Sequence, residues 1–405
     1  MLTNEEIRRQ AELQHDYVIE CRRTIHRFAE VSGTEFKTSA FIEGEIKKTG
    51  LPYEKAGVTG WIAILDTGKP GPRIALRADI DALPVPEEPN NLAGPRVVMS
   101  DDSHTSHACG HDAHSAMLLG SMRALVANRD QLNGVVYFCF EEGEEDGKGI
   151  PFMIDQLKAH GVDVCWGIHV YAGLESGRIC VSHGPRMAGA AEVRIKVIGK
   201  GGHGSRPDMA ANPVFCAAAI LTNTATAWVN QISAGKTVTL GVTSIHGGEA
   251  GNVIPDTASM LGSLRFFDDA EGEKAVQVFK KVAEHTAAMN NCHVEFGERF
   301  RVLCAPVIND EHYSNLIANA LPEVLPEGAV SPCEPWYASE AFSRYREICP
   351  SVFAHLGINN PAYGSGAPHH NGFFDVDENV LSLGLMSTLK FVDAVESESR
   401  KDMTV

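Results

Sequence analysis

Short apolar segments alternate with helical patterns through the first 188 residues, and this alternation restricts the fold more than any other feature of the sequence. Apolar runs of strand length occupy residues 73–77, 134–140 and 162–170. The apolar spacing of helices is found in residues 4–30, 111–126 and 152–160. Strands that alternate with helices are typical of a parallel sheet covered by helices on both faces. We therefore expect an α/β fold with a mostly parallel sheet.

The pattern changes near residue 188. A strand-like segment is followed by a long Ala-rich helix, two strand-like runs and a further helix, at residues 191–198, 212–231, 238–244, 259–267 and 270–289. This order suits a small α+β domain with one open sheet face. After about residue 300 helices and short strands return. We expect a discontinuous α/β domain of residues 1–188 and 300–405, interrupted by an inserted domain of residues 189–299.

Charge and composition exclude several classes of partner. The 405 residues contain 35 Lys and Arg against 52 Asp and Glu, a formal net charge of −17. Nucleic acids and anionic membranes bind clustered basic residues, so we expect neither as a partner. No apolar run is long enough to span a bilayer. The polar N-terminal segment does not resemble a signal peptide, and ten scattered cysteines without a C-x-x-C pair fit a reducing, cytoplasmic location.

One eight-residue segment before a predicted helix is rich in metal-binding side chains. It reads His107-Ala108-Cys109-Gly110-His111-Asp112-Ala113-His114. Thiolate and imidazole are good ligands for zinc-like divalent metals, and a one-residue spacer lets Cys109 and His111 face the same point. The alternative is a polar helix entrance with Asp112 at the positive end of the helix dipole.

Carboxylates collect where two predicted strands end. The run Glu141-Glu142-Gly143-Glu144-Glu145-Asp146 follows residues 134–140 directly. Such a run is usually a solvated loop, but open α/β sheets bind ligands at the carboxyl ends of their strands, and a dication would relieve the repulsion. Asp79 and Asp81 also follow a strand, although they could form a turn before Pro84.

Two more histidines could complete a metal site. His169 ends the strand-like run 162–170, where a lone histidine is usually structural, and His370 lies in a Gly-rich loop. Five plausible ligands result: Cys109, His111, Glu145, His169 and His370. A catalytic zinc takes about three protein ligands, so five suit two metals about 3.5–4 Å apart. Glu144 could then act as a general base without binding metal. The thiolate favours zinc and the carboxylates also suit manganese.

A glycine-rich segment matches the dinucleotide-binding pattern and is rejected. Gly199-Lys200-Gly201-Gly202-His203-Gly204 fits G-x-G-x-x-G, but residues 209–248 contain no Asp or Glu to bind a ribose. An NAD-dependent oxidoreductase is therefore a distant third hypothesis, after the two functions given below. The alternative is a flexible loop that presents His203 to a substrate.

The motifs together resemble those of a known family. Over almost its full length the chain resembles the dinuclear-metal amidohydrolases, which include hippurate hydrolases, indole-acetyl-amino-acid hydrolases and N-acetyl-diaminopimelate deacetylases. The matching segments, in the same order, are residues 77–84, 107–112, 167–169, 199–205, 251–255 and 370–371.

The resemblance implies roles for individual residues. The family's metal ligands correspond to Cys109, His111, Glu145, His169 and His370. Glu144 matches the general base, Asp81 an acidic residue that orients a site group, and His203 a histidine that steadies the oxyanion. Asn252 and Arg265 match residues that hold a substrate carboxylate. The resemblance also implies that the inserted domain closes over the site and forms a homodimer, and that the substrate is an N-acyl amino acid or similar small amide.

Three motifs depart from the family pattern. The usual Q-P-A-E-E is Glu141-Glu142-Gly143-Glu144-Glu145, H-N-P is His370-Asn371-Gly372, and S-E-D-F is Ser339-Glu340-Ala341-Phe342. Because the last ligand is found by counting back from Asn371 and Phe374, His369 is an alternative to His370. A relative that binds metal or ligand without catalysis is the alternative function, although the Glu144-Glu145 pair favours an enzyme.

Overall fold

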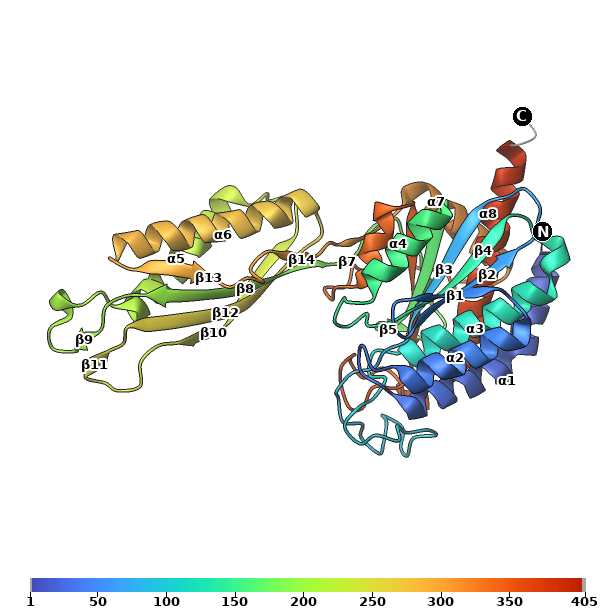
Figure 1. The fold of residues 1–405 in the computed structure, drawn as a ribbon, viewed down its shortest axis with the longest axis horizontal. Coiled ribbons are helices and arrows are strands. Elements are labelled where there is room, and N and C mark those ends of the chain that lie inside the picture. Colours follow the sequence, from blue (N-terminus) through green and yellow to red (C-terminus); the bar gives the residue numbers. More distant parts are fainter. Residues whose placement is uncertain (1, 403–405) are drawn as a thin grey trace. The chain divides into compact units, whose positions relative to one another are not determined.

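The computed structural model describes residues 2–402, and the chain divides into two compact units (Figure 1). The first unit contains the residues up to Gly184, Ile308–Glu334 and the residues from Arg344 onward. The second contains Pro185–Val307 and Pro335–Ser343. The segment expected as an inserted domain, residues 189–299, falls in the second unit, which also takes in the Ser339-Glu340-Ala341-Phe342 motif.

The first unit is built on a seven-stranded sheet. Its strands, in spatial order, are β1 (Tyr53–Ala56), β2 (Gly60–Asp66), β4 (Val135–Glu141), β3 (Arg73–Asp79), β5 (Val164–Glu175), β16 (Ser351–Asn359) and β6 (Ile179–Cys180). The four central strands β4, β3, β5 and β16 are parallel. The outer pairs β1–β2, β2–β4 and β16–β6 are antiparallel. The sheet is thus mixed, with a parallel centre.

Helices cover both faces of this sheet, as the alternation of strands and helices predicts. On one face, α1 (Asn4–Phe28), α3 (His111–Ala127) and α8 (Leu381–Asp402) pack together. Phe138, Phe140 and Trp166 point into this core. Tyr137, directly before Phe138, points to the opposite face and contacts His160 of α4 (Ile150–His160), with ring centroids 4.9 Å apart. The remaining helices of the unit are α2 (Phe36–Thr49) and α7 (Glu311–Ala320).

Local sequence explains where α1 and α3 begin. Thr3 caps α1, because its hydroxyl accepts a hydrogen bond from the backbone N–H of Glu6. The apolar face of α1 is buried through Ile7, Val18 and Ile25. Gly110, at the cap position of α3, has a φ of 93° in the left-handed region. The chain therefore turns sharply between Cys109 and His111.

The second unit has an antiparallel sheet with helices on one face (Figure 1). Its strand order is β10 (Val238–His246), β12 (Thr257–Phe266), β8 (Gly189–Ile198) and β13 (His293–Phe296), and β14 (Val302–Cys304) also pairs with β8. Helices α5 (Pro213–Gln231) and α6 (Asp269–Met289) bury its apolar core. The short strands β9 (Gly202–His203) and β11 (Val253–Ile254) pair with each other. Strands β7 (Gly184–Met187) and β15 (Val307–Asn309) lie at the chain boundaries of the units.

Within residues 2–402, no helix combines the length and apolar character that crossing a membrane would require.

Candidate metal centre

The carboxyl ends of the central strands bring the predicted metal ligands together in the first unit. Asp79 ends β3, Glu141 ends β4, and His169 lies within β5. These three strands are adjacent and parallel, so their carboxyl ends lie at one edge of the sheet. This is the edge where open α/β sheets bind ligands.

Three of the predicted ligands form a buried group. The ligand atoms of Cys109, His111 and His169 lie within 4.8 Å of one another. Cys109 Sγ is 3.6 Å from His169 Nε2. The turn at Gly110 permits this approach, because a Cβ there would lie only 2.3 Å from Val170 Cγ2. Glycine is thus required between the cysteine and the histidine.

Two further groups overlap the first. Cys109, Glu145 and His370 form one, and His111, Glu144 and Glu145 form the other, each with its ligand atoms within 4.8 Å. The His370 Nε2 atom is 3.4 Å from Glu145 Oε1. The five predicted ligands and the predicted base are therefore neighbours in the structure.

The geometry favours His370 over His369 as a ligand. His370 adopts a φ of 59°, rare for a residue other than glycine, and its backbone N–H donates to the Ala108 carbonyl at 2.9 Å. This places its ring beside Glu145. The His369 ring is turned elsewhere, since its Nε2 accepts a hydrogen bond from the Ala172 N–H at 3.1 Å.

The donor set fits a divalent cation. Within the described residues, His111 Nε2 and Glu145 Oε1 are buried without a hydrogen-bond partner, and they lie 3.8 Å apart. Burial raises the pKa of the Cys109 thiol well above its usual value. A bound dication would deprotonate this thiol and supply the partner that both orphaned atoms lack.

Asp81 orients the His111 ring through a contact with its Nδ1 atom. Its Oδ1 lies 3.0 Å from His111 Nδ1, and its Oδ2 accepts from the Ser32 hydroxyl at 2.7 Å and the Glu145 N–H at 3.0 Å. Burial raises the pKa of Asp81, but its hydrogen bond to His111 and the charge of that ring outweigh burial, so its pKa lies below the usual value. An ionised Asp81 keeps the proton of His111 on Nδ1 and leaves Nε2 for a metal.

A fourth group is better explained by hydrogen bonding. Asp79, His111 and His114 also have their ligand atoms within 4.8 Å. Asp79, however, pairs with Arg77 at 2.7 Å and with His114 Nδ1 at 2.6 Å. The other nitrogen of His114 accepts from the Val170 N–H at 2.9 Å. No role was predicted for His114 or Ser32. For His114 a signal existed, since it lies one helical turn after His111.

Comparison with known proteins identifies the family. Residues 75–392 match peptidase family M20/M25/M40. The chain belongs to this family. Thermostable carboxypeptidase 1 of Saccharolobus solfataricus is 34% identical over 379 residues, covering 92% of this chain and 93% of that protein. N-acetyl-L-cysteine deacetylase of Bacillus subtilis is 32% identical over 365 residues, covering 90% of this chain and 84% of that protein.

A solved structure supports the same conclusion. A Bacillus subtilis protein described as a dinuclear metal-binding peptidase of the M20 family superposes with a TM-score of 0.81 at 27% identity, covering 95% of this chain and 99% of that one. This M20 member is therefore a metal-dependent hydrolase of amide bonds, and it binds divalent metal. Its substrates are small amides or peptides.

The other predicted site residues of this M20 chain lie in the second unit. His203 in β9 pairs with Val253 of β11, and its Nδ1 is 2.7 Å from the Ser205 hydroxyl. Asn252 accepts a backbone hydrogen bond from Gly204 at 2.8 Å, so it lies next to His203. Arg265 in β12 donates to the Ser339 hydroxyl at 2.9 Å. His203 and Asn252 therefore form one group, whereas Arg265 is held by the Ser339 segment.

Proposed function

We propose that the protein hydrolyses N-acyl amino acids or similar small amides at two divalent metal ions. Their ligands would be Cys109, His111, Glu145, His169 and His370. The observation that carries the proposal is the overlap of three ligand groups. Each pair of groups has one residue in common, which is Cys109, His111 or Glu145, and one group includes Glu144. The names of the similar carboxypeptidase and N-acetyl-L-cysteine deacetylase support this substrate class.

The metals would polarise the substrate carbonyl and lower the pKa of a water molecule. Glu144 would accept a proton from the attacking water and deliver it to the leaving amine. His203 would donate a hydrogen bond to the developing oxyanion, and Asn252 and Arg265 would bind the substrate carboxylate. Asp81 would hold His111 in the tautomer that leaves Nε2 unprotonated.

Zinc and manganese are the ions that we propose. The Cys109 thiolate would favour the softer zinc, whereas Glu145 also suits manganese. We also propose a cytoplasmic location, since a reducing compartment would keep the Cys109 thiol available.

We also propose a homodimer formed through the second unit. Strand β10 is at the edge of its sheet. Phe215 and Val229 of α5 are 73% and 85% exposed. Unpaired strand edges and exposed apolar side chains are typical of surfaces that associate. Analytical ultracentrifugation of the native protein and of Val229→Glu checks this proposal, with a dimer expected for the former and a weakened dimer for the latter.

Metal removal and reconstitution test the proposed reaction. The protein is dialysed against a chelator, reloaded with Zn²⁺ or Mn²⁺, and assayed for amine release from a panel of N-acyl amino acids. We expect the chelated protein to be inactive, two ions per chain to restore activity, and N-acyl amino acids to outcompete simple amides. Full activity after chelation would refute the metal site. Two bound ions without turnover of any substrate would favour the metal-binding relative that lacks catalysis.

A further inference from the structure

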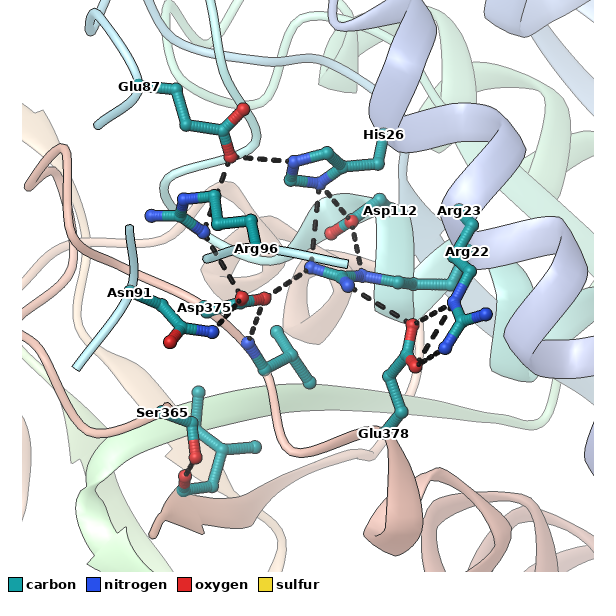
Figure 2. A network of polar contacts seen from close by, with 12 residues as sticks. Arg22, Arg23, His26, Glu87, Asn91, Arg96, Asp112, Ser365, Asp375 and Glu378 are labelled. Carbon is teal, nitrogen blue, oxygen red and sulfur yellow. Dashed lines mark hydrogen bonds and ion pairs between the residues drawn. The ribbon is translucent and has the colours of Figure 1, made fainter. Parts of the chain in front are cut away.

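Figure 2 shows a largely buried cluster of charged side chains that includes Asp112, the residue that follows the proposed ligand His111. We call it the Arg22 network, and it consists of Arg22, Arg23, His26, Glu87, Arg96, Asp112, Asp375 and Glu378. Its residues come from α1, from the loop before α3, from the first turn of α3 and from the segment before α8. None of them is among the proposed metal ligands or substrate-binding residues.

Arg22 is the centre of this network. Its Nε donates to Asp112 Oδ2 at 2.8 Å, its Nη2 to Asp375 Oδ1 at 2.9 Å, and its Nη1 to Glu378 Oε1 at 3.2 Å. The Arg22 side chain is only 3% exposed. One guanidinium group thus joins three carboxylates, and Figure 2 shows them around it.

His26 and Arg96 extend the network to the loop before α3. His26 Nδ1 lies 2.8 Å from Asp112 Oδ2 and its Nε2 lies 2.8 Å from Glu87 Oε1. Arg96 Nη1 is 3.2 Å from Asp375 Oδ2 in an ion pair without hydrogen-bond geometry. Arg96 Nη2 also donates to the Gly372 carbonyl at 2.7 Å. Asp112 and Asp375 are therefore each fixed by two basic side chains.

Both of these carboxylates lie on segments that carry proposed metal ligands. Asp112 follows His111 directly in the first turn of α3. Asp375 lies in the segment of His370, and that segment also contacts the ligand loop, because the His370 N–H donates to the Ala108 carbonyl at 2.9 Å. These segments are far apart in the sequence, and Arg22 belongs to neither. Arg22 of α1 therefore joins the segments of His111 and His370 in addition to their direct contact.

The network is better suited to fixing geometry than to adding stability. Buried ion pairs gain little net free energy because the charges lose their hydration. Helix α1 is held in the fold by its buried apolar residues Ile7, Val18 and Ile25 instead. A planar guanidinium can serve three carboxylates in fixed directions, which a lysine ammonium cannot do. Loss of Arg22 would leave Asp112 and Asp375 with one basic partner each.

We propose that Arg22 is a positioning residue for the metal centre. It holds the segments of His111 and His370 in the arrangement that binds two metal ions before any metal is present. This inference rests on the proposed metal ligands. It assigns to Arg22 no contact with metal or substrate.

Metal titration of the full-length protein tests this role. Metal-free native protein, Arg22→Lys and Arg23→Met are titrated with Zn²⁺ against a competing chelator, and the unfolding of each metal-free protein is measured. Arg23 is the matched control because, among the described residues, it pairs with Glu378 but with neither Asp112 nor Asp375, and its side chain is 36% exposed. We expect about 10–100-fold weaker metal binding for Arg22→Lys, which is the usual range for residues that position metal ligands. For Arg23→Met we expect less than a twofold change in metal affinity.

Kinetics separate positioning from a general loss of structure. At saturating Zn²⁺ the Arg22→Lys protein should keep the native KM and recover most of its kcat. Metal affinity that is equal in native protein and Arg22→Lys would overturn the proposal, as would an equal loss in Arg23→Met. If Arg22→Lys does not fold, Asp375→Asn, which keeps the Arg22 contacts to Asp112 and Glu378, is expected to weaken metal binding in the same way, and native affinity in it would overturn the proposal.

His370→Ala distinguishes a failure of the Arg22 proposal from a failure of the proposed metal-ligand assignment. We expect it to lose affinity for at least one ion. Native metal binding in His370→Ala would refute the ligand assignment and the Arg22 proposal with it. Weak binding in His370→Ala together with native binding in Arg22→Lys would refute the role of Arg22 alone.

Discussion

His111 and Asp81 face each other across a single short contact, with His111 Nδ1 3.0 Å from Asp81 Oδ1. The contact fixes the ring so that Nε2 points toward Glu145 Oε1, 3.8 Å away. Asp81 lies just after β3 and His111 opens α3. The contact between the end of β3 and the start of α3 thus decides which nitrogen of His111 can bind a metal.

Asp81→Asn should weaken metal binding, because an asparagine amide can donate to Nδ1 and move the histidine proton to Nε2. We expect metal affinity or kcat to fall about 10–100-fold. A competition titration with a chelator measures the affinity, and kcat is measured at saturating metal. Asp66→Asn, on the exposed end of β2, is the control. Native values for both quantities in Asp81→Asn would contradict the orienting role.

Glu144→Gln should separate metal binding from turnover. The amide cannot accept the proton of water, so we expect kcat to fall about 10²–10⁴-fold while metal content stays native. Elemental mass spectrometry and amine release are the two measurements. Asp146→Asn is the matched control in the same loop, since Asp146 contacts the exposed Lys148. A Glu144→Gln protein with native kcat would show that another group acts as the base.

Gly110→Ala should destabilise the fold for two reasons. A φ of 93° costs a non-glycine residue about 1–2 kcal/mol, and the new methyl group would meet Val170, which adds about 1–3 kcal/mol. Gly33→Ala is the control, because Gly33 has a φ of 80° but no atom within 4 Å of its ideal Cβ position among the described residues. Chemical denaturation of the metal-free proteins measures both. Equal losses of unfolding free energy would mean that Val170 moves aside without cost.

Glu396→Gln should stabilise the protein at alkaline pH. Glu396 in α8 is 0% exposed, and burial raises its pKa from 4.5 to about 7 despite a hydrogen bond from the Asn133 N–H. The folded protein holds this proton more tightly than the unfolded chain, so the contribution of Glu396 is full below pH 4.5 and is lost as the pH rises through about 7.

The pH dependence of unfolding checks the sign of this effect. At pH 8 we expect Glu396→Gln to unfold with a free energy higher than native by up to ~3 kcal/mol, and near pH 4.5 the two should be similar. Glu398→Gln is the control, as Glu398 is partly exposed and pairs with His312 on the surface. A native protein whose stability rises between pH 5 and 8 relative to Glu396→Gln would contradict the prediction.

Much of the fold could be predicted because its signals are local. The predicted helix at residues 4–30 is α1, Asn4–Phe28, and the predicted helix at residues 270–289 is α6, Asp269–Met289. Within this helix, however, Leu13 is 58% exposed although Val18 and Ile25 are buried. Helical spacing specifies a stripe but not its width. Helix α2, Phe36–Thr49, was not predicted, and its interrupted apolar pattern is a weak signal.

The site was predictable where its residues follow one another. Spacing alone suggests that Cys109 and His111 converge, and the structure places Glu144, Glu145, His169 and His370 around them. Spacing could not choose between His369 and His370, because the choice depends on the φ of His370 and its contact with Ala108. Nor could it reveal Arg22, whose partners Asp112 and Asp375 lie in distant segments. Contacts between side chains of distant segments leave no periodic pattern in the amino-acid sequence.

The position of β16 has a consequence for how the protein is made. This strand, Ser351–Asn359, lies between β5 and β6, so the long parallel edge of β5 has no neighbour until residues 351–359 have been translated. His370 emerges still later. Nascent chains generally fold from the N-terminus onward, so the second unit can be complete while the first still waits for its last strand. The proposed metal centre is then complete only after β16 has been made, because its last ligand, His370, follows that strand in the chain.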